Sequence, residues 1–114
     1  MVREWLEFFE TVGFTRKLHQ IANRETLGAI QSDLTAAPDR WPVAKGTHSA
    51  RKGRVADPES ARGKSRSFRY YYVYLSRRGR VYLLAIYSKS EASDLTADQK
   101  RRVASIVAAI EQED

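Results

Sequence analysis

Basic side chains are concentrated in one third of the sequence. Between Lys45 and Arg80 there are eleven Lys or Arg residues and only two acidic residues, so this segment has a charge of +9. The other 78 residues have a charge of −3, and the whole chain is +6. A run of charges often only keeps a loop solvated, but an excess this large favours phosphate backbones or acidic protein partners. We expect this basic surface to bind RNA.

The composition argues against a metal site or a disulfide. The chain has no cysteine, which excludes disulfides and thiolate zinc sites, and its two histidines, His19 and His48, are too few for a histidine cluster. We therefore expect no metal and no cofactor. With 114 residues, 42% of them hydrophobic and 30% charged, the sequence predicts a single globular domain over residues 1–114.

The hydropathy pattern indicates a cytoplasmic protein. No apolar run approaches the length needed to cross a bilayer. The segment from Met1 to Glu10 interleaves charged residues with aromatic ones, which is not the pattern of a signal peptide. We expect no membrane partner.

The N-terminal third predicts a strand followed by two short helices. Aromatic and β-branched residues favour a strand over Glu7–Val12, with Gly13 as a break and Thr15 placed to cap the first helix. Pro38 and Pro42 should end the second helix. The apolar residues at helical spacing are Phe14, Leu18 and Ile21, then Leu27, Ile30 and Leu34.

The rest of the chain predicts three strands and a helix. We expect a short strand around Ala50–Ala56 and an exposed loop through Lys64, then a hairpin of Phe68–Leu75 and Arg80–Ser88. The second hairpin strand is apolar on both faces, as in a central strand. Thr96 and Gln99 form a capping box that begins the last helix. The predicted class is α+β: strand, two-helix hairpin, three antiparallel strands and C-terminal helix.

The segment from Arg69 to Gln99 carries a specific motif. Its sequence, RYYYVYLSRRGRVYLLAIYSKSEASDLTADQ, resembles the HigB-like branch of the RelE superfamily, which are toxins of bacterial type II toxin–antitoxin systems. The matching positions are Arg69, Tyr72, Gly79, Tyr82, Leu83, Leu84, Tyr87, Lys89, Glu91, Asp94, Leu95, Thr96 and Gln99. Arg51-Lys52-Gly53-Arg54 and Gly63-Lys64 also resemble family segments. The resemblance covers Phe9 to Ile110 and implies a RelE-like fold.

The sequence departs from the family pattern in the basic segment. Where the family has glycines before its R-K-x-R run, this chain has His48-Ser49, and where it has a glycine pair before the sheet arginine, this chain has Arg66-Ser67. We interpret His48 as a loop histidine and His19 as a structural one.

The resemblance implies a toxin that cleaves mRNA on the ribosome and so inhibits translation. A cognate antitoxin would neutralise it, and operator DNA would be contacted only indirectly, through that antitoxin. Two alternatives share this fold and charge: a non-catalytic toxin of the ParE type that inhibits DNA gyrase, and an inactive RNA-binding or antitoxin-binding module.

RNA carries its own nucleophile, the 2′-hydroxyl, so basic side chains on a rigid sheet can supply most of the catalysis without a metal. Arg69 is the first candidate, because a guanidinium matches two phosphate oxygens, although it could instead pair with an acid and only hold the sheet. Tyr87 could hold a base or move a proton, with Lys89 beside it, or simply pack on the sheet. The family pattern adds Lys52 and Lys64 near the scissile phosphate. The remaining RNA-binding candidates are Arg51, Arg54, Arg62 and Arg66.

Overall fold

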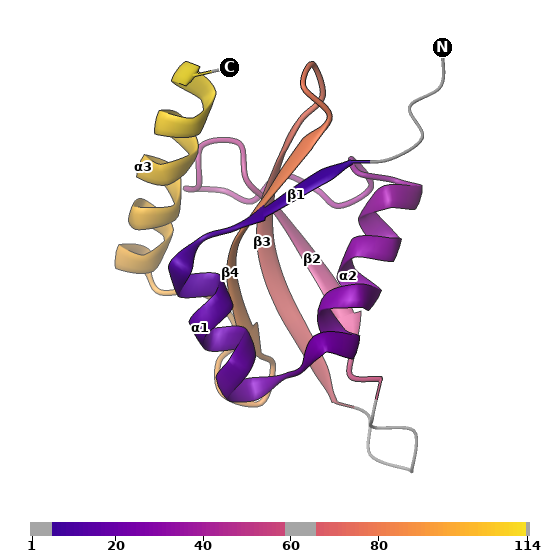
Figure 1. Cartoon of the computed structure of the whole chain (residues 1–114). Helices are drawn as coiled ribbons and strands as arrows, with labels where there is room; N and C mark the ends of the chain where they lie inside the picture. Colours follow the sequence, from indigo (N-terminus) through magenta and orange to yellow (C-terminus); the bar gives the residue numbers. More distant parts are fainter. Residues whose placement is uncertain (1–5, 59–65, 114) are drawn as a thin grey trace.

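The computed structural model describes residues 6–58 and 66–113 (Figure 1). The elements run in the order β1 (Glu7–Glu10), α1 (Val12–Ile21), α2 (Arg24–Ala36), β2 (Arg51–Ala56), β3 (Ser67–Leu75), β4 (Arg80–Ser88) and α3 (Ala97–Glu113). This is the predicted α+β class with the predicted order of elements, which the structure confirms. None of the helices within the described ranges is long and apolar enough to cross a bilayer.

The described strands form a four-stranded sheet in the order β1-β4-β3-β2. Strand β3 pairs antiparallel with both β2 and β4, whereas β1 pairs parallel to β4. Strand β4 therefore lies inside the sheet, as its continuous apolar sequence predicted. Gly79 closes the β3–β4 hairpin with a φ of 66°, in the left-handed region that glycine adopts without strain.

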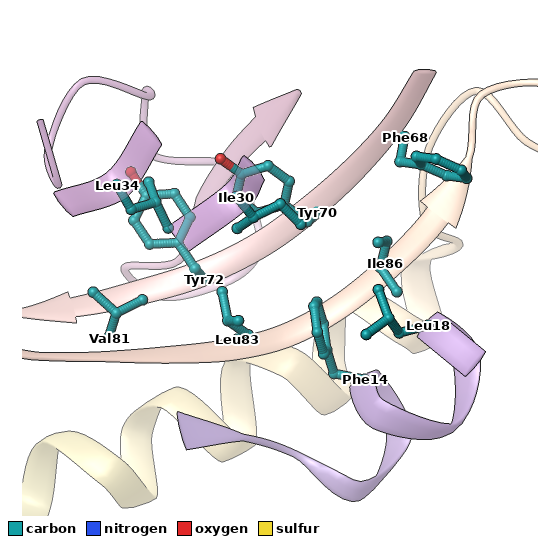
Figure 2. Packing of buried hydrophobic residues seen from close by; sticks show 10 residues of the cluster. All are labelled: Phe14, Leu18, Ile30, Leu34, Phe68, Tyr70, Tyr72, Val81, Leu83 and Ile86. Carbon is teal, nitrogen blue, oxygen red and sulfur yellow. The ribbon is translucent and has the colours of Figure 1, made fainter. Parts of the chain in front are cut away.

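Helices cover both faces of the sheet. On one face, α1 and α2 contribute Phe14, Leu18, Ile30 and Leu34, which pack against alternate residues of β3 and β4 (Figure 2). On the other face, α3 contributes Val103 and Val107, which pack against the intervening strand residues. Figure 1 shows the sheet between α2 and α3. We call the second face the α3 face.

A β-bulge in β4 changes which side chains reach the α3 face. The register between β3 and β4 shifts by one between Tyr71 and Tyr72, whose partners are Ala85 and Leu83, so that Leu84 is the extra residue. As a result, Leu84 and Ala85 both lie against the α3 cluster, although they are neighbours in sequence.

The N-cap of α1 lies four residues earlier than the predicted cap. Thr11, not Thr15, is its N-cap, because the Thr11 hydroxyl accepts a hydrogen bond from the Phe14 amide at 3.0 Å. The same hydroxyl donates to the Leu84 carbonyl at 3.0 Å, which anchors the helix to the bulge. Gly13, predicted to separate the first strand from the first helix, instead lies in the first turn of α1.

The other predicted helix boundaries are confirmed. Asn23 caps α2 by accepting from the Thr26 amide at 3.1 Å, which explains why α1 and α2 are separate helices. Helix α2 ends at Ala36, shortly before Pro38. In the capping box of α3, the Thr96 amide donates to Gln99 Oε1 at 2.8 Å and the Gln99 amide donates to Thr96 Oγ1 at 3.2 Å.

Candidate nucleic-acid interface

Four candidate residues share the α3 face because of the strand register. Residues that are directly opposite on antiparallel strands point to the same face, and so do residues two apart on one strand. Lys52 lies opposite Tyr71, and Arg69 lies between Arg54 and Tyr87. Since Tyr71 and Tyr87 both pack in the α3 cluster, Lys52, Arg54 and Arg69 extend the same face beyond its apolar core.

The two arginines remain available for a ligand. The Arg69 guanidinium donates to Ser67 Oγ at 3.2 Å, a neutral partner that orients it without cancelling its charge. Neither Arg69 nor Arg54 forms an ion pair with any residue in the described ranges. Together with Lys52 and Gly53 they line a depression of about 290 Å³ that reaches Trp41 and Pro42. A guanidinium in this setting can bind two phosphate oxygens.

Asp94 is the acidic centre of the same face. Its Oδ1 lies 3.2 Å from Lys52 Nζ and accepts a short hydrogen bond from the Tyr71 hydroxyl, and its Oδ2 lies 2.9 Å from Lys100 Nζ. The Leu95 amide also donates to Oδ1, at 2.7 Å. Partial burial raises the pKa of Asp94, but these hydrogen bonds outweigh burial and hold the pKa well below its usual value. Asp94 is therefore ionised at neutral pH.

The charges of Lys52 and Tyr87 follow from the same contacts. Partial burial lowers the pKa of Lys52, but its hydrogen bonds to Asp94 and Tyr87 outweigh burial and raise it. Burial raises the pKa of Tyr87, and the opposing effect of the Lys52 ammonium does not cancel this. At neutral pH the face therefore presents a cationic lysine beside a protonated phenol. A protonated phenol can donate a proton but is a poor base.

Tyr87 is more deeply buried than a base-stacking residue would be. Its side chain is only 4% exposed, and its hydroxyl lies 3.3 Å from the Ser93 carbonyl and 3.5 Å from Asp94 Oδ1. This burial leaves little of the ring face for a base to stack on, which argues against the predicted alternative that Tyr87 holds a base.

The structure places one predicted residue, Arg51, on the opposite face of the sheet. Arg51 lies opposite Tyr72 on the α1–α2 face, where its guanidinium donates to the carbonyls of Asp39 at 3.1 Å and Trp41 at 2.6 Å. Lys89 follows the end of β4, in an exposed turn, and its side chain makes no hydrogen bond or ion pair within the described part of the chain. Lys89 thus lies one residue beyond the predicted strand end, and its predicted role beside Tyr87 stays a prediction.

The basic loop is only partly described. Lys64 and Arg62 lie outside the described residues, so their predicted roles stay predictions. Arg66, at the edge of that gap, lies 3.2 Å from Asp57 Oδ2 and is 62% exposed. This pair joins the end of β2 to the start of β3.

His48 has a structural role in the described conformation. Its φ of 67° lies in the left-handed region, and its Nε2 is 2.9 Å from Glu111 Oε1 on α3. A glycine adopts this φ without strain, whereas a residue with a β-carbon rarely does.

Three residues of the site are absent from the predicted site residues. They are Asp94, Lys100 and Tyr71. Asp94 stands in the DLT part of the motif, so the signal was present in the sequence. Its partners come from β2, β3 and α3, and only the tertiary fold brings them together.

A second hollow has a volume of about 320 Å³, and its walls are α1, β4, the β4–α3 loop and the first turns of α3. Tyr87 and Asp94 line this groove too. At its rim, Glu91 pairs with Lys17 at 2.9 Å and accepts from the Ser88 amide at 2.8 Å. The amide and then Lys17 lower the pKa of Glu91.

No family model matches the sequence. Among solved structures, the chain is similar to a mutant of the toxin RelE from E. coli in its free state, with a TM-score of 0.55 and 11% sequence identity. The match covers 78% of this chain and 88% of that chain. The fold is RelE-like. This confirms the fold that the motif implied, whereas membership of the HigB-like branch stays a prediction.

Proposed function

We propose that this chain is a toxin that cleaves mRNA on the ribosome, without a metal, and that a cognate antitoxin neutralises it. The observation that carries the proposal is the convergence of Lys52, Arg54, Arg69 and Tyr87 on one face of the sheet. When RNA is cleaved by its own 2′-hydroxyl, cations can stabilise the additional charge on the phosphate and a protonated phenol can donate a proton to the leaving oxygen. The RelE-like fold adds support.

The chemistry follows from the charge states of these groups. The 2′-oxygen attacks the adjacent phosphorus, the bond from phosphorus to the 5′-oxygen breaks, and the 2′-hydroxyl proton passes to solvent. Arg69 and Lys52 stabilise the additional negative charge on the phosphoryl oxygens, as a preorganised cation does. Tyr87 donates a proton to the departing 5′-oxygen. Arg54, at the exposed edge of the sheet, holds a neighbouring phosphate.

The proposal is tested by inducing the protein in growing bacterial cells and following three quantities together. These are protein synthesis, DNA synthesis, and the positions of new mRNA 5′ ends. We expect protein synthesis to stop first, with new ends inside translated reading frames. If DNA synthesis stops first and mRNA stays intact, the protein is a gyrase inhibitor. If neither stops, it is an inactive binding module.

A further inference from the structure

Asp94 joins four elements of the fold on the α3 face. Its carboxylate contacts Lys52 on β2, Tyr71 on β3, Tyr87 on β4 and Lys100 on α3. A carboxylate beside a phosphate site repels the ligand unless cations outnumber it. Here two ammonium groups share one carboxylate, so the cluster keeps a positive charge even before Arg54 and Arg69 are counted.

The contacts of Asp94 go beyond what helix capping needs. The capping box of Thr96 and Gln99 already provides acceptors for two backbone amides at the start of α3. Asp94 accepts one backbone hydrogen bond, from the next residue, Leu95. Its other contacts are to side chains of the sheet and to Lys100, and they orient those side chains.

Lys52 needs such a partner to have a defined position. A lysine side chain has a flexible four-carbon stem, and β2 is an edge strand of the sheet. The ammonium of Lys52 is held from one side by Asp94 Oδ1 at 3.2 Å, and it lies 5.9 Å from the centre of the Tyr71 ring. Only 28% of the Lys52 side chain is exposed.

We propose that Asp94 is a positioning residue, whose carboxylate holds the Lys52 ammonium beside the Tyr87 hydroxyl and leaves Arg54 and Arg69 free to receive the phosphate. The inference rests on the proposed function for what Lys52 does, but not for where Lys52 lies. The raised pKa of Lys52 agrees with this arrangement, since Asp94 favours the ammonium form. Lys100 balances the second carboxylate oxygen, so that Asp94 is not drawn away from Lys52.

The test combines a contact readout with a kinetic one. The ammonium protons of an ion-paired lysine exchange slowly with water and give a ¹H–¹⁵N correlation signal. In the wild type we expect such signals for Lys52 and Lys100. Asp94→Asn should abolish both and lower kcat for ribosome-bound mRNA by roughly ten- to a hundredfold, because the ammonium is no longer held in place. Its KM should stay unchanged or fall, since the variant is one charge more positive.

Glu91→Gln is the matched control. It makes the same chemical change in the same loop and removes an ion pair of 2.9 Å, but that pair is with Lys17 on α1 and not with Lys52. This variant should keep the Lys52 signal and the wild-type kcat. Asp94→Glu keeps the charge but displaces it by one methylene, so it should retain a Lys52 signal and still lose rate. If Asp94→Asn does not fold, Asp94→Glu still tests whether the position of the Lys52 ammonium affects the rate.

The outcomes separate the positioning role from the proposed function. A Lys52 signal that persists in Asp94→Asn overturns the positioning role. A full kcat in Asp94→Asn or Asp94→Glu also overturns it, because the position of Lys52 would then not matter. If the wild type cleaves no mRNA but shows the two signals, and Asp94→Asn loses them, the proposed function fails and the positioning of Lys52 stands.

Discussion

Gly53 and Tyr70 are cross-strand partners, and the Tyr70 ring occupies the space that a side chain at position 53 would need. A β-carbon built at Gly53 would lie 2.4 Å from Tyr70 Cζ and 2.6 Å from its hydroxyl oxygen. Tyr70 is fully buried in the cluster with α1 and α2, so it cannot move aside at low cost. Gly53, which lies between Lys52 and Arg54, thus allows β2 to pair closely with β3.

We predict that Gly53→Ala destabilises the protein by about 1–3 kcal/mol, because the new methyl group overpacks a rigid core. Gly28→Ala is the control. It lies in α2 with no atom within 4 Å of the added β-carbon, and it should stabilise the helix by up to about 1 kcal/mol. Urea unfolding of the two variants measures both effects. Equal stability of the two variants would contradict the contact with Tyr70.

A second prediction concerns the start of α1. Thr11→Ala should cost about 1–2 kcal/mol of unfolding free energy, because it removes the N-cap and the hydrogen bond to the Leu84 carbonyl. Thr15→Ala should cost much less, since its hydroxyl only donates to Glu10 Oε1 at the surface, at 2.7 Å. Thermal unfolding of both variants gives the comparison. A larger loss for Thr15→Ala would restore Thr15 as the cap.

The contrast between Thr11 and Thr15 illustrates what the sequence could predict. The hairpin of β3 and β4 and the capping box of α3 depend on neighbouring residues, and both were predicted correctly. Two threonines near one helix start are locally similar, and the choice between them depends on Leu84, 73 residues away. The parallel pairing of β1 with β4 is equally non-local.

The candidate site also combines features that neighbouring residues determine with features that depend on distant contacts. The strand positions of Arg69 and Tyr87 follow from sequence, and the register that joins them to Lys52 follows from the hairpin and β2. The position of Arg51 on the opposite face follows from the alternation of residues along β2. The prediction grouped Arg51 with the other basic residues of the segment and did not use this alternation. Asp94 was missed because its role depends on Lys52, which precedes it by 42 residues.

A third prediction uses the lowered pKa of Asp94. When folding lowers the pKa of a carboxyl, its ionised form stabilises the protein at any pH above the unfolded pKa, which is near 3.8 for Asp94. This contribution is lost as the pH falls from the unfolded pKa through the lower folded pKa. We therefore expect the melting temperature of the wild type to fall below about pH 4 more steeply than that of Asp94→Asn. Melting curves between about pH 2 and 6 measure the difference. Parallel curves would mean that Asp94 gains no partner on folding.

A fourth prediction concerns RNA affinity. Arg54→Ala should weaken binding to RNA or ribosomes and reduce the slope of log affinity against log salt concentration by about one, the value for one lost phosphate contact. Arg77→Ala removes the same charge from the exposed turn between β3 and β4, far along the sheet from Arg54. Its slope should match the wild type. If Arg77 and Arg54 contribute equally, binding does not depend on the α3 face.

The central claim is that Arg69 acts in the chemical step, and a purified system tests it most directly. Programmed ribosomes carrying a defined mRNA are mixed with saturating wild-type protein, Arg69→Ala or Arg77→Ala, and cleavage is followed by primer extension. We predict that Arg69→Ala loses about 3–4 kcal/mol of transition-state stabilisation, a few hundredfold in rate, while it still binds the ribosome and Arg77→Ala cleaves normally. Cleavage by Arg69→Ala at the wild-type rate would contradict the account and move the catalytic role to Lys52 and Tyr87.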